Sequence, residues 1–255
     1  MGLLTGKKAL IFGIANNKSI AYGIAKKFKE EGAELAVSYA GEKLESRVVP
    51  IAEELGAKLC VPCDVTCDED IEKAFGIIAR DFGNIDILIH SIAYAPGEAL
   101  KGRYIDTTRD AFRLSMDISA YSLVALCKAA EPIMNEWGSV INLSYYGAEK
   151  VVTNYNLMGV AKAALECSTR YLSCDLGVKK IRINSISAGP IKTLAASGIG
   201  GFKNILAHIE ERSPLHQNVT IEDVGDTAAF LASDLSKMIT GETLHVDCGY
   251  NVIGI

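Results

Sequence analysis

The chain has 255 residues, of which 49% are apolar and 22% are charged, and its formal net charge is −5. This length suits one large domain or two small ones, and the apolar fraction excludes an intrinsically disordered chain. A mildly acidic chain is a poor partner for nucleic acid or an anionic membrane, and no apolar run approaches the roughly 20 residues that span a bilayer. The N-terminal sequence MGLLTGKKALIFG lacks the features of a signal peptide. We therefore expect a cytoplasmic protein with no nucleic-acid partner and no membrane partner.

The seven cysteines are odd in number and scattered along the chain, which argues against a disulfide framework. Only Cys60, Cys63 and Cys67 cluster, and the nearest histidine that could complete a metal site is His90. We expect no metal, and we interpret Cys60 and Cys63 as small apolar side chains on or just after a strand.

Short β-rich runs alternate with helical stretches along the whole chain. The strand candidates cover residues 7–13, 33–39, 57–63, 85–91, 139–145, 181–187 and 242–247. The helix candidates cover residues 20–32, 42–56, 68–83, 109–136, 154–176 and 220–233, the last opening with a Thr-x-x-Asp capping box. Several strands are nearly continuous apolar runs, which is typical of strands covered on both faces. The alternation predicts one α/β domain over residues 1–255, a doubly wound parallel sheet of about seven strands flanked by helices.

Residues 188–213 interrupt this alternation with an irregular stretch that carries a Gly-Gly pair. A long insertion after the carboxyl end of a strand in such a fold is often a binding loop or lid. We expect a substrate-binding lid near residues 194–212.

The first strand runs into the segment GIANNKSIAYG, from Gly13 to Gly23. This is not the G-x-G-x-x-G fingerprint, because Ala15 stands in place of the second glycine. A glycine just past the strand, a polar loop and Ser19 as helix N-cap would nevertheless offer free N–H groups to a pyrophosphate. The alternative is an ordinary strand–helix turn with a capping serine.

The end of the second strand is where an acidic residue often binds the ribose of NAD and a basic one accommodates the phosphate of NADP. Ala40 is not basic, which favours NADH, and Glu42 is a candidate acceptor for the ribose hydroxyls. Lys43 and Arg47 keep NADPH open as the less favoured cofactor.

The third and fourth strands end in Cys63-Asp64-Val65 and in HSIA, residues 90–93. Asp64 is placed either to contact an adenine edge or to cap the next helix. The small residues after His90 would let the backbone approach a cofactor. His90 itself is interpreted as a satisfied strand histidine.

Tyr155 and Lys162 are the most informative pair, seven residues apart. On an α-helix this spacing is nearly two turns, which would place both side chains on one face about 10 Å apart. A lysine beside a bound cofactor can bind the nicotinamide ribose, and a tyrosine hydroxyl can donate a hydrogen bond or a proton. The alternative is an amphipathic helix with a tyrosine near its start and a solvated lysine.

Together with AGPIKT after the sixth strand, this pair resembles the short-chain dehydrogenase/reductase superfamily. The commoner members have Tyr-x3-Lys, whereas Met158 stands in that tyrosine position here. The pattern Tyr145-x9-Tyr155-x6-Lys162, with GIANNKSIAYG, HSIAYAP, SAGPIKTLAASGI and TIEDVGDTAAFL, is similar to the NADH-dependent enoyl-acyl-carrier-protein reductases of bacterial and plastid fatty-acid synthesis. These matches run from about residue 2 to residue 250.

This resemblance implies a Rossmann-like NAD-binding domain and hydride transfer from NADH to Cβ of a trans-2-enoyl thioester, the last reduction of fatty-acid elongation. It implies that Tyr155 stabilises the enolate oxygen, that Lys162 orients the nicotinamide ribose, and that Tyr145 lines the same pocket. Tyr145 could equally be an aromatic packed at a strand end. A tyrosine displaced along the chain suits the longer reach from Cβ to the thioester oxygen.

The resemblance also assigns residues to the two binding sites. The implied cofactor contacts are Gly13, Ser19, Ile20, Asp64, Val65, Ile92, Lys162, Ile191, Thr193, Leu194 and Ala195. The implied substrate contacts are Ala95, Tyr145, Tyr155, Met158, Ala196, Ile199 and Phe202. The implied partners are an enoyl substrate bound to acyl carrier protein and further copies of the chain, in a homotetramer.

Two alternatives remain at this stage. One is a 3-oxoacyl or carbonyl reductase of the same superfamily, which Met158 disfavours. The other is a non-catalytic module that senses NAD(H), which would not require Tyr155.

Overall fold

The structure is a computed structural model of the chain, and it describes residues 2–194, 196 and 200–254. Its strands form one seven-stranded sheet in which every neighbouring pair is parallel. The strands are β1 (Lys8–Phe12), β2 (Glu34–Tyr39), β3 (Leu59–Pro62), β4 (Ile85–His90), β5 (Met134–Ser144), β6 (Arg182–Ala188) and β7 (Thr243–Val246). The order across the sheet is β3-β2-β1-β4-β5-β6-β7. This confirms the predicted doubly wound parallel sheet.

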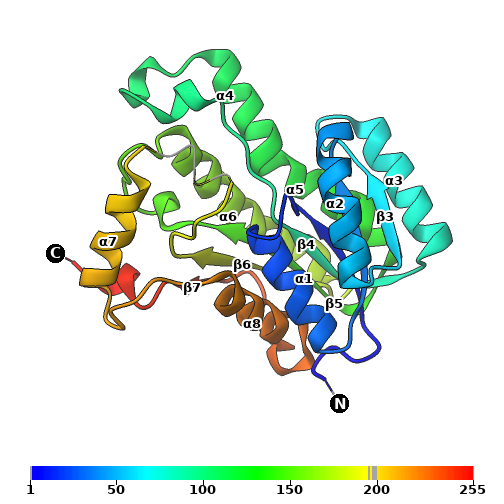
Figure 1. Cartoon of the computed structure of the whole chain (residues 1–255). Helices are drawn as coiled ribbons and strands as arrows, with labels where there is room; N and C mark the ends of the chain where they lie inside the picture. The colour runs from blue at the N-terminus through cyan, green and yellow to red at the C-terminus, as the bar shows by residue number, and fades with distance from the viewer. Residues whose placement is uncertain (1, 195, 197–199, 255) are drawn as a thin grey trace.

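Helices cover both faces of the sheet (Figure 1). They are α1 (Ile20–Glu30), α2 (Glu42–Leu55), α3 (Asp68–Asp81), α4 (Arg109–Met116), α5 (Ser122–Ala130), α6 (Leu157–Gly177), α7 (Phe202–Arg212) and α8 (Ile221–Ala232). One apolar core joins α1, α2 and α8 to the sheet, and a second core joins α3, α5 and α6 to its other face. Alternate residues of the central strands belong to different cores, as Leu10 and Ile11 do on β1. Burial on both faces explains why these strands read as continuous apolar runs.

The stretch between residues 109 and 136 differs from the single helix that its pattern predicts. The structure has α4, a π-helical turn over Asp117–Tyr121, and then α5, which ends at Ala130. Pro132 cannot donate the backbone hydrogen bond that would continue α5, so a short 3-10 turn follows and β5 begins at Met134. The predicted strand 139–145 is therefore only the second half of β5.

Other predicted boundaries agree closely with the structure. The capping box of α8 is confirmed, since the Thr220 hydroxyl accepts from the Asp223 N–H at 3.2 Å and the Asp223 carboxylate accepts from the Thr220 N–H at 2.8 Å. Cys60 lies on β3 and Cys63 is buried just after it, as expected of small apolar side chains. Within the predicted lid, α7 lies beside the C-terminus at the left of Figure 1.

The strand order reverses between β1 and β4, and this switch point is where ligands bind in open α/β sheets. At the carboxyl edge there, the Ser91 N–H donates to the Phe12 carbonyl at 3.0 Å. Gly13 has φ +108°, and a Cβ on it would lie 2.0 Å from the Ser91 carbonyl oxygen. Only glycine fits this approach, which brings the loops after β1 and β4 together.

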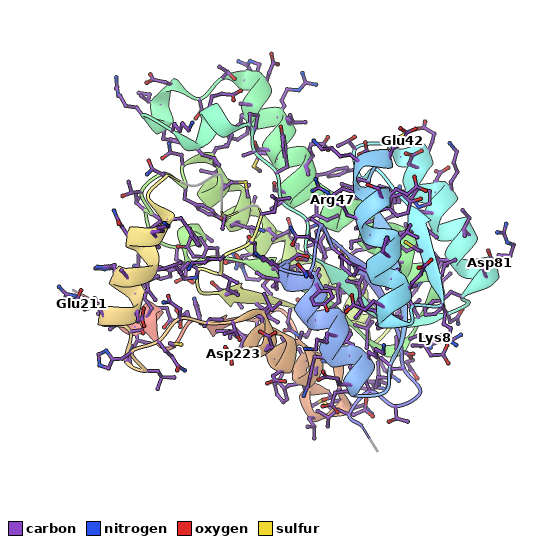
Figure 2. The ribbon with its side chains drawn as sticks, viewed as in Figure 1. Lys8, Glu42, Arg47, Asp81, Glu211 and Asp223 are labelled. Carbon is purple, nitrogen blue, oxygen red and sulfur yellow. The ribbon has the colours of Figure 1, made fainter. Side chains whose placement is uncertain are left out.

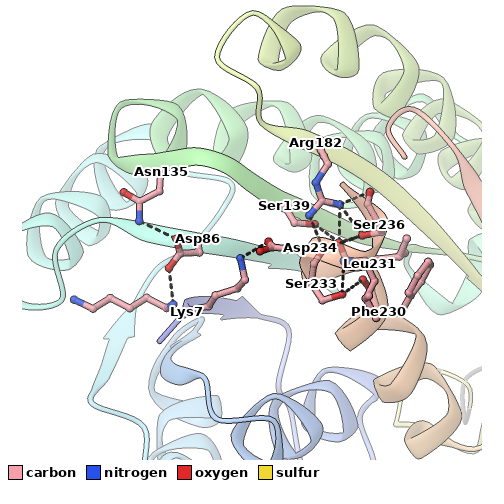
Figure 3. Close-up of polar contacts among 12 residues, drawn as sticks. Lys7, Asp86, Asn135, Ser139, Arg182, Phe230, Leu231, Ser233, Asp234 and Ser236 are labelled. Carbon is pink, nitrogen blue, oxygen red and sulfur yellow. Dashed lines mark hydrogen bonds and ion pairs between the residues drawn. The ribbon is translucent and has the colours of Figure 1, made fainter. Parts of the chain in front are cut away.

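At the amino-terminal ends of the strands, a buried arginine connects β6 to the end of α8 (Figure 3). The Arg182 guanidinium, at the start of β6, donates to the Leu231 carbonyl at 2.8 Å and to the Ser236 hydroxyl at 2.8 Å. It also reaches the Ser233 carbonyl at 3.3 Å. These are acceptors at the carboxyl end of α8, where a cation is favoured by both the free carbonyls and the helix dipole.

α1 and α8 pack against each other through glycine (Figure 1). A Cβ on Gly23 would lie 2.5 Å from the Ile221 carbonyl oxygen, and a Cβ on Gly225 would lie 2.9 Å from the Gly23 carbonyl oxygen. No real Cβ tolerates a contact of 2.5 Å to backbone, so the substitution must separate the helices.

Gly23→Ala should therefore lower the free energy of unfolding by about 1–3 kcal/mol, measured by urea denaturation. The matched control is Gly76→Ala in α3, where a Cβ would meet nothing within 4 Å. This control should stabilise the protein by about 0.5–1 kcal/mol through helix propensity. Equal effects of the two substitutions would contradict the close crossing of α1 and α8.

Candidate active site

The last two residues of β5 and the residue that follows them contact the three side chains that form the centre of the site. The Leu143 carbonyl accepts a hydrogen bond from Lys162 Nζ at 2.6 Å. The hydroxyl of the next residue, Ser144, donates to the carboxylate of Glu166. Tyr145, the residue after that, packs edge-on against Tyr155 with ring centroids 4.8 Å apart and planes at 72°. The register between β5 and α6 therefore fixes this centre.

Tyr155 does not lie on the helix that carries Lys162, contrary to the sequence prediction. α6 begins at Leu157, after two residues with positive φ, Asn154 at 62° and Asn156 at 38°. A left-handed residue cannot continue a right-handed helix, so Tyr155 belongs to the turn before α6. Its carbonyl accepts from the Met158 N–H at 2.9 Å, which ties this turn to the first turn of the helix.

Two glycines make room for Tyr155. A Cβ on Gly147 would lie 2.5 Å from Cδ1 of the Tyr155 ring, and a Cβ on Gly159 would lie 2.6 Å from the Gly147 carbonyl oxygen. The loop after β5 therefore lies directly on the start of α6, with the tyrosine ring against it. The sequence analysis missed both glycines.

Tyr155 is 8% exposed and packs with Leu100 and Met158. Burial, with smaller contributions from Tyr145 and Glu166, raises the pKa of its hydroxyl above the ordinary value of 10.0. The phenol is therefore the favoured form. Among the described residues its hydroxyl has no hydrogen-bond partner, so it is free to donate to a bound molecule. Burial also raises the pKa of the neighbouring Tyr145 to about 12.

Lys162 is 6% exposed, so the alternative of a solvated lysine is wrong. Burial lowers the pKa of its ammonium from 10.5 to about 8, and the negative charge of Glu166 opposes that change. A buried amine with a pKa in this range is a recognised sign of a functional position.

His90, at the end of β4, is fully buried, and its Nε2 lies 2.8 Å from the Ser122 hydroxyl. Burial, with the nearby Lys162 charge, lowers the pKa of His90 from 6.5 to about 3. The histidine is therefore neutral, which agrees with its interpretation as a core histidine. Its Nδ1 has no partner among the described atoms.

Four of the residues implied as substrate contacts lie together. Tyr155 and Met158 form a buried cluster with Leu100, and Ala95 and Tyr145 pack against it. Ala196 is buried and Phe202 begins α7, and neither belongs to this cluster. Ala195 and Ile199 lie outside the described residues.

Two features near this cluster were not predicted. Leu100 belongs to the cluster but comes from a 3-10 turn in the long connection after β4. Ser119, on the π-helical turn, lies 3.8 Å from the Met158 sulfur and bonds both the N–H and the carbonyl of Tyr94 at 2.9 Å. A π-helical turn inside a longer helix often marks a functional site, but periodicity alone does not reveal it.

A cavity of ≈ 340 Å³ opens beside Tyr145. Its lining includes the rings of Tyr146, Tyr250 and His208. The Tyr146 and Tyr250 rings meet edge-on with centroids 5.9 Å apart, and the His208 and Tyr250 rings meet edge-on with centroids 6.0 Å apart. His208 lies on α7 and Tyr250 lies near the C-terminus. Sequence reasoning missed these residues because they follow the core motif by some fifty to a hundred positions.

The residues implied as cofactor contacts follow β1, β3, β4 and β6, whose carboxyl ends share one edge of the parallel sheet. Asp64 accepts from the Thr66 N–H at 3.0 Å and from its hydroxyl at 2.8 Å, so it shapes the turn and does not cap α3. Val65 is buried beside it and Ile92 is half-buried. Ile191 packs against the first core.

The remaining residues implied on the cofactor side lie in the loop after β6. The Thr193 hydroxyl accepts from the Ala196 N–H at 3.1 Å, and Leu194 is exposed. Figure 2 shows Glu42 and Arg47 on α2, and both of these side chains are exposed.

Ser19 occupies the N-cap position of α1, but its side chain does not cap the helix. Its hydroxyl instead accepts from the Ala15 and Asn16 N–H groups at 3.3 and 3.4 Å. Among the described residues, the first two N–H groups of α1, those of Ile20 and Ala21, have no capping acceptor. Uncapped N–H groups at a helix N-terminus attract phosphate.

A family model described as Enoyl-(Acyl carrier protein) reductase matches residues 13–251. The chain belongs to this family. A relative from Aquifex aeolicus, the NADH enoyl-[acyl-carrier-protein] reductase FabI, is 55% identical over 256 residues, which is 100% of this chain and 95% of that protein. The corresponding FabI of Bacillus cereus is 50% identical over 256 residues, the whole of both chains.

Solved structures agree with this assignment. The Aquifex aeolicus enzyme matches with a TM-score of 0.97 and 55% identity over all of both chains. The Bacillus cereus enzyme, solved with NADP+ and indole naphthyridinone, matches with a TM-score of 0.98 and 50% identity over all of both chains. The Anaplasma phagocytophilum enzyme, solved with NAD, matches with a TM-score of 0.95 and 49% identity over 100% of this chain and 95% of that one. The resemblance stated from the motifs is thereby confirmed.

Among the described residues of this family member, no group of three or more His, Cys, Asp and Glu side chains is suited to hold a metal ion. Nor does any helix among those residues have the length and apolarity to cross a membrane.

The buried neutral His90 should make stability depend on pH. Because its folded-state pKa of about 3 lies below the ordinary 6.5, the unfolded chain takes up a proton in this window and the folded protein does not. The free energy of unfolding should therefore fall by about 1.4 kcal/mol per pH unit from this group as pH drops from 6.5 toward 3.

Urea denaturation at several pH values should show that the free energy of unfolding changes less with pH in His90→Asn than in the parent. The control His216→Asn removes an exposed histidine. A slope in His90→Asn that equals the parent slope would contradict the neutral buried state.

Proposed function

We propose that this member of the enoyl-(acyl carrier protein) reductase family reduces the 2,3-double bond of a trans-2-enoyl thioester, with Tyr155 and Lys162 as its catalytic residues. The observation that carries the proposal is the hydroxyl of the buried Tyr155, which has no hydrogen-bond partner among the described residues and lies in the turn before the helix that carries the buried Lys162. Bound NADH would supply the hydride for Cβ.

Tyr155 stabilises the charge that develops on the thioester oxygen as Cβ accepts the hydride. Its raised pKa keeps the proton on the phenol, so the hydroxyl donates a hydrogen bond to this oxygen. A donor already in place in a site with little water stabilises the transition state more than water does. Tyr145 holds the Tyr155 ring from the side, which limits the directions in which the hydroxyl points.

Lys162 presents an ammonium to the nicotinamide ribose. Its Nζ donates one hydrogen bond, to the Leu143 carbonyl, so the group is held in place and keeps further N–H donors for ribose hydroxyls. With a pKa of about 8, the ammonium is the major form at neutral pH.

The residues at the N-terminus of α1 fit a dinucleotide. Its uncapped first turn suits a pyrophosphate, and Ser19 orders the preceding loop without occupying these N–H groups. Asp64 and Val65 lie at the carboxyl end of β3, where an adenine would bind. The absence of a basic residue at Ala40 favours NADH, while the exposed Arg47 leaves NADPH as the weaker alternative.

The substrate side of the proposal comprises the cluster of Ala95, Tyr155 and Met158 with the lid near residues 194–212. An acyl chain would lie against these apolar walls. Acyl carrier protein would deliver the substrate, and further copies of the chain would complete a homotetramer. We propose that the enzyme acts in the cytoplasm, at the final reduction of fatty-acid elongation.

The decisive experiment follows the oxidation of NADH and NADPH optically, with crotonyl thioester and acetoacetyl thioester offered separately. Oxidation with the enoyl substrate alone, and faster with NADH, is the expected result. Oxidation with the keto substrate would establish a carbonyl reductase instead. NADH binding without turnover of either substrate would establish a non-catalytic binding module.

Tyr155→Phe should lower kcat with crotonyl thioester by about 100-fold, because it removes one hydrogen-bond donor to the developing oxyanion. NADH binding should change little. The matched control is Tyr171→Phe, which removes a hydroxyl from an exposed ring on α6 and should leave kcat unchanged. A Tyr155→Phe enzyme with the parent kcat would remove Tyr155 from the mechanism.

A further inference from the structure

Glu166 is a buried carboxylate that the reaction outlined above does not use. It lies on α6 one helical turn after Lys162 and is 8% exposed. Its Oε1 accepts a hydrogen bond from the Ser144 hydroxyl. A Lys-x3-Glu spacing is commonly a surface ion pair, but here both side chains are buried, and Lys162 Nζ bonds the Leu143 carbonyl instead of the carboxylate.

The charged groups around Glu166 divide into two sets. Toward the reaction centre its charge acts on Lys162, on the same helix, and on Tyr155, in the turn before it. Toward the surface it faces Arg170 on α6, and Glu149 and His245, which pair at 2.8 Å between the loop after β5 and β7. Glu166 therefore lies between charged groups at the surface and the buried side chains of Lys162 and Tyr155.

Two further groups face the catalytic pair itself. His90, on β4, is neutral and lies close enough to Lys162 for the lysine charge to lower its pKa. Tyr145 faces Tyr155 and is itself influenced by Tyr250. Neither His90 nor Tyr145 supplies a negative charge near neutral pH, so Glu166 is the anion buried one helical turn from Lys162.

We propose that Glu166, buried one helical turn from Lys162 and bonded to the β5 residue next to the one that Lys162 bonds, is a positioning residue whose carboxylate keeps Lys162 as an ammonium. This inference rests on the proposed function, because it assigns that ammonium to binding the nicotinamide ribose.

A nearby negative charge favours an ammonium over a neutral amine, so it retains the proton on Lys162. Burial acts against the ammonium and lowers the pKa of Lys162 to about 8 even with Glu166 present. Without that carboxylate, Lys162 would lose its proton nearer to neutral pH, and the ribose would lose a charged donor.

The test is Glu166→Gln, which keeps the length of the side chain and an acceptor for Ser144 but removes the charge. NADH affinity would be titrated by protein-to-nicotinamide fluorescence transfer from about pH 6 to 10, alongside kcat/KM with crotonyl thioester. In the parent, both should decline as Lys162 loses its proton. In the variant, the decline should begin about one pH unit lower.

The matched control is Glu149→Gln, which makes the same change at the carboxylate paired with His245. Its alkaline decline should coincide with that of the parent. Glu166→Asp, which restores the charge, should move the decline back toward the parent position. If Glu166→Gln does not fold, Glu166→Ala removes the same charge and gives the same test.

Two results would overturn the proposal. A decline in NADH affinity at the parent pH in a folded, neutral variant would show that the carboxylate does not act on Lys162. A loss of NADH affinity and of kcat/KM that is equal at every pH, together with a lower Tm, would show that Glu166 has a structural role only. Failure of the proposed function is separate, since the parent would then bind NADH without reducing the enoyl thioester, and the binding titration would still decide the role of Glu166.

Discussion

The close packing of α6 on the end of β5 is the constraint on which this site depends. The last two residues of β5 meet Lys162 and Glu166, and the next residue, Tyr145, meets Tyr155, so a shift of one residue in register between β5 and α6 would separate the first two contacts. Gly147 and Gly159 permit the approach, because a side chain at either position would enter Tyr155 or the backbone. The geometry of Tyr155 and Lys162 is therefore set by backbone packing and does not require the two side chains to bond each other.

Two buried cations lie at opposite ends of the strands, and they differ in how many hydrogen-bond acceptors surround them. Arg182 donates to several acceptors at the end of α8, and this pairing fixes the cation in a structural role. Lys162 bonds a single carbonyl among the described residues, so its ammonium keeps donors for a ligand. A charge left incompletely paired is costly to bury. The same cost lowers the pKa of Lys162 and makes its protonation sensitive to a nearby carboxylate.

The sheet could be predicted from the sequence because burial on both faces leaves each strand as an apolar run. The start of β5 could not, since Pro132 ends the helical stretch within a run that still looks helical. Ser19 was placed correctly as the residue before α1, but its hydroxyl bonds the preceding loop, a choice that no residue pattern records. Glu166 was missed because its spacing from Lys162 is the same as that of a solvated ion pair.

Tyr155 shows why motif spacing should be interpreted through turn chemistry as well as helical periodicity. The two asparagines that flank it, Asn154 and Asn156, are among the few residues that tolerate positive φ, and both adopt it here. The tyrosine therefore leaves the helix and meets the end of β5, where its hydroxyl has no partner among the described residues. If the tyrosine were moved one turn along a continuous helix, its side chain would still project from the same face of the helix. A tyrosine carried on a separate turn is free to point elsewhere, which is what a donor for the distant thioester oxygen requires.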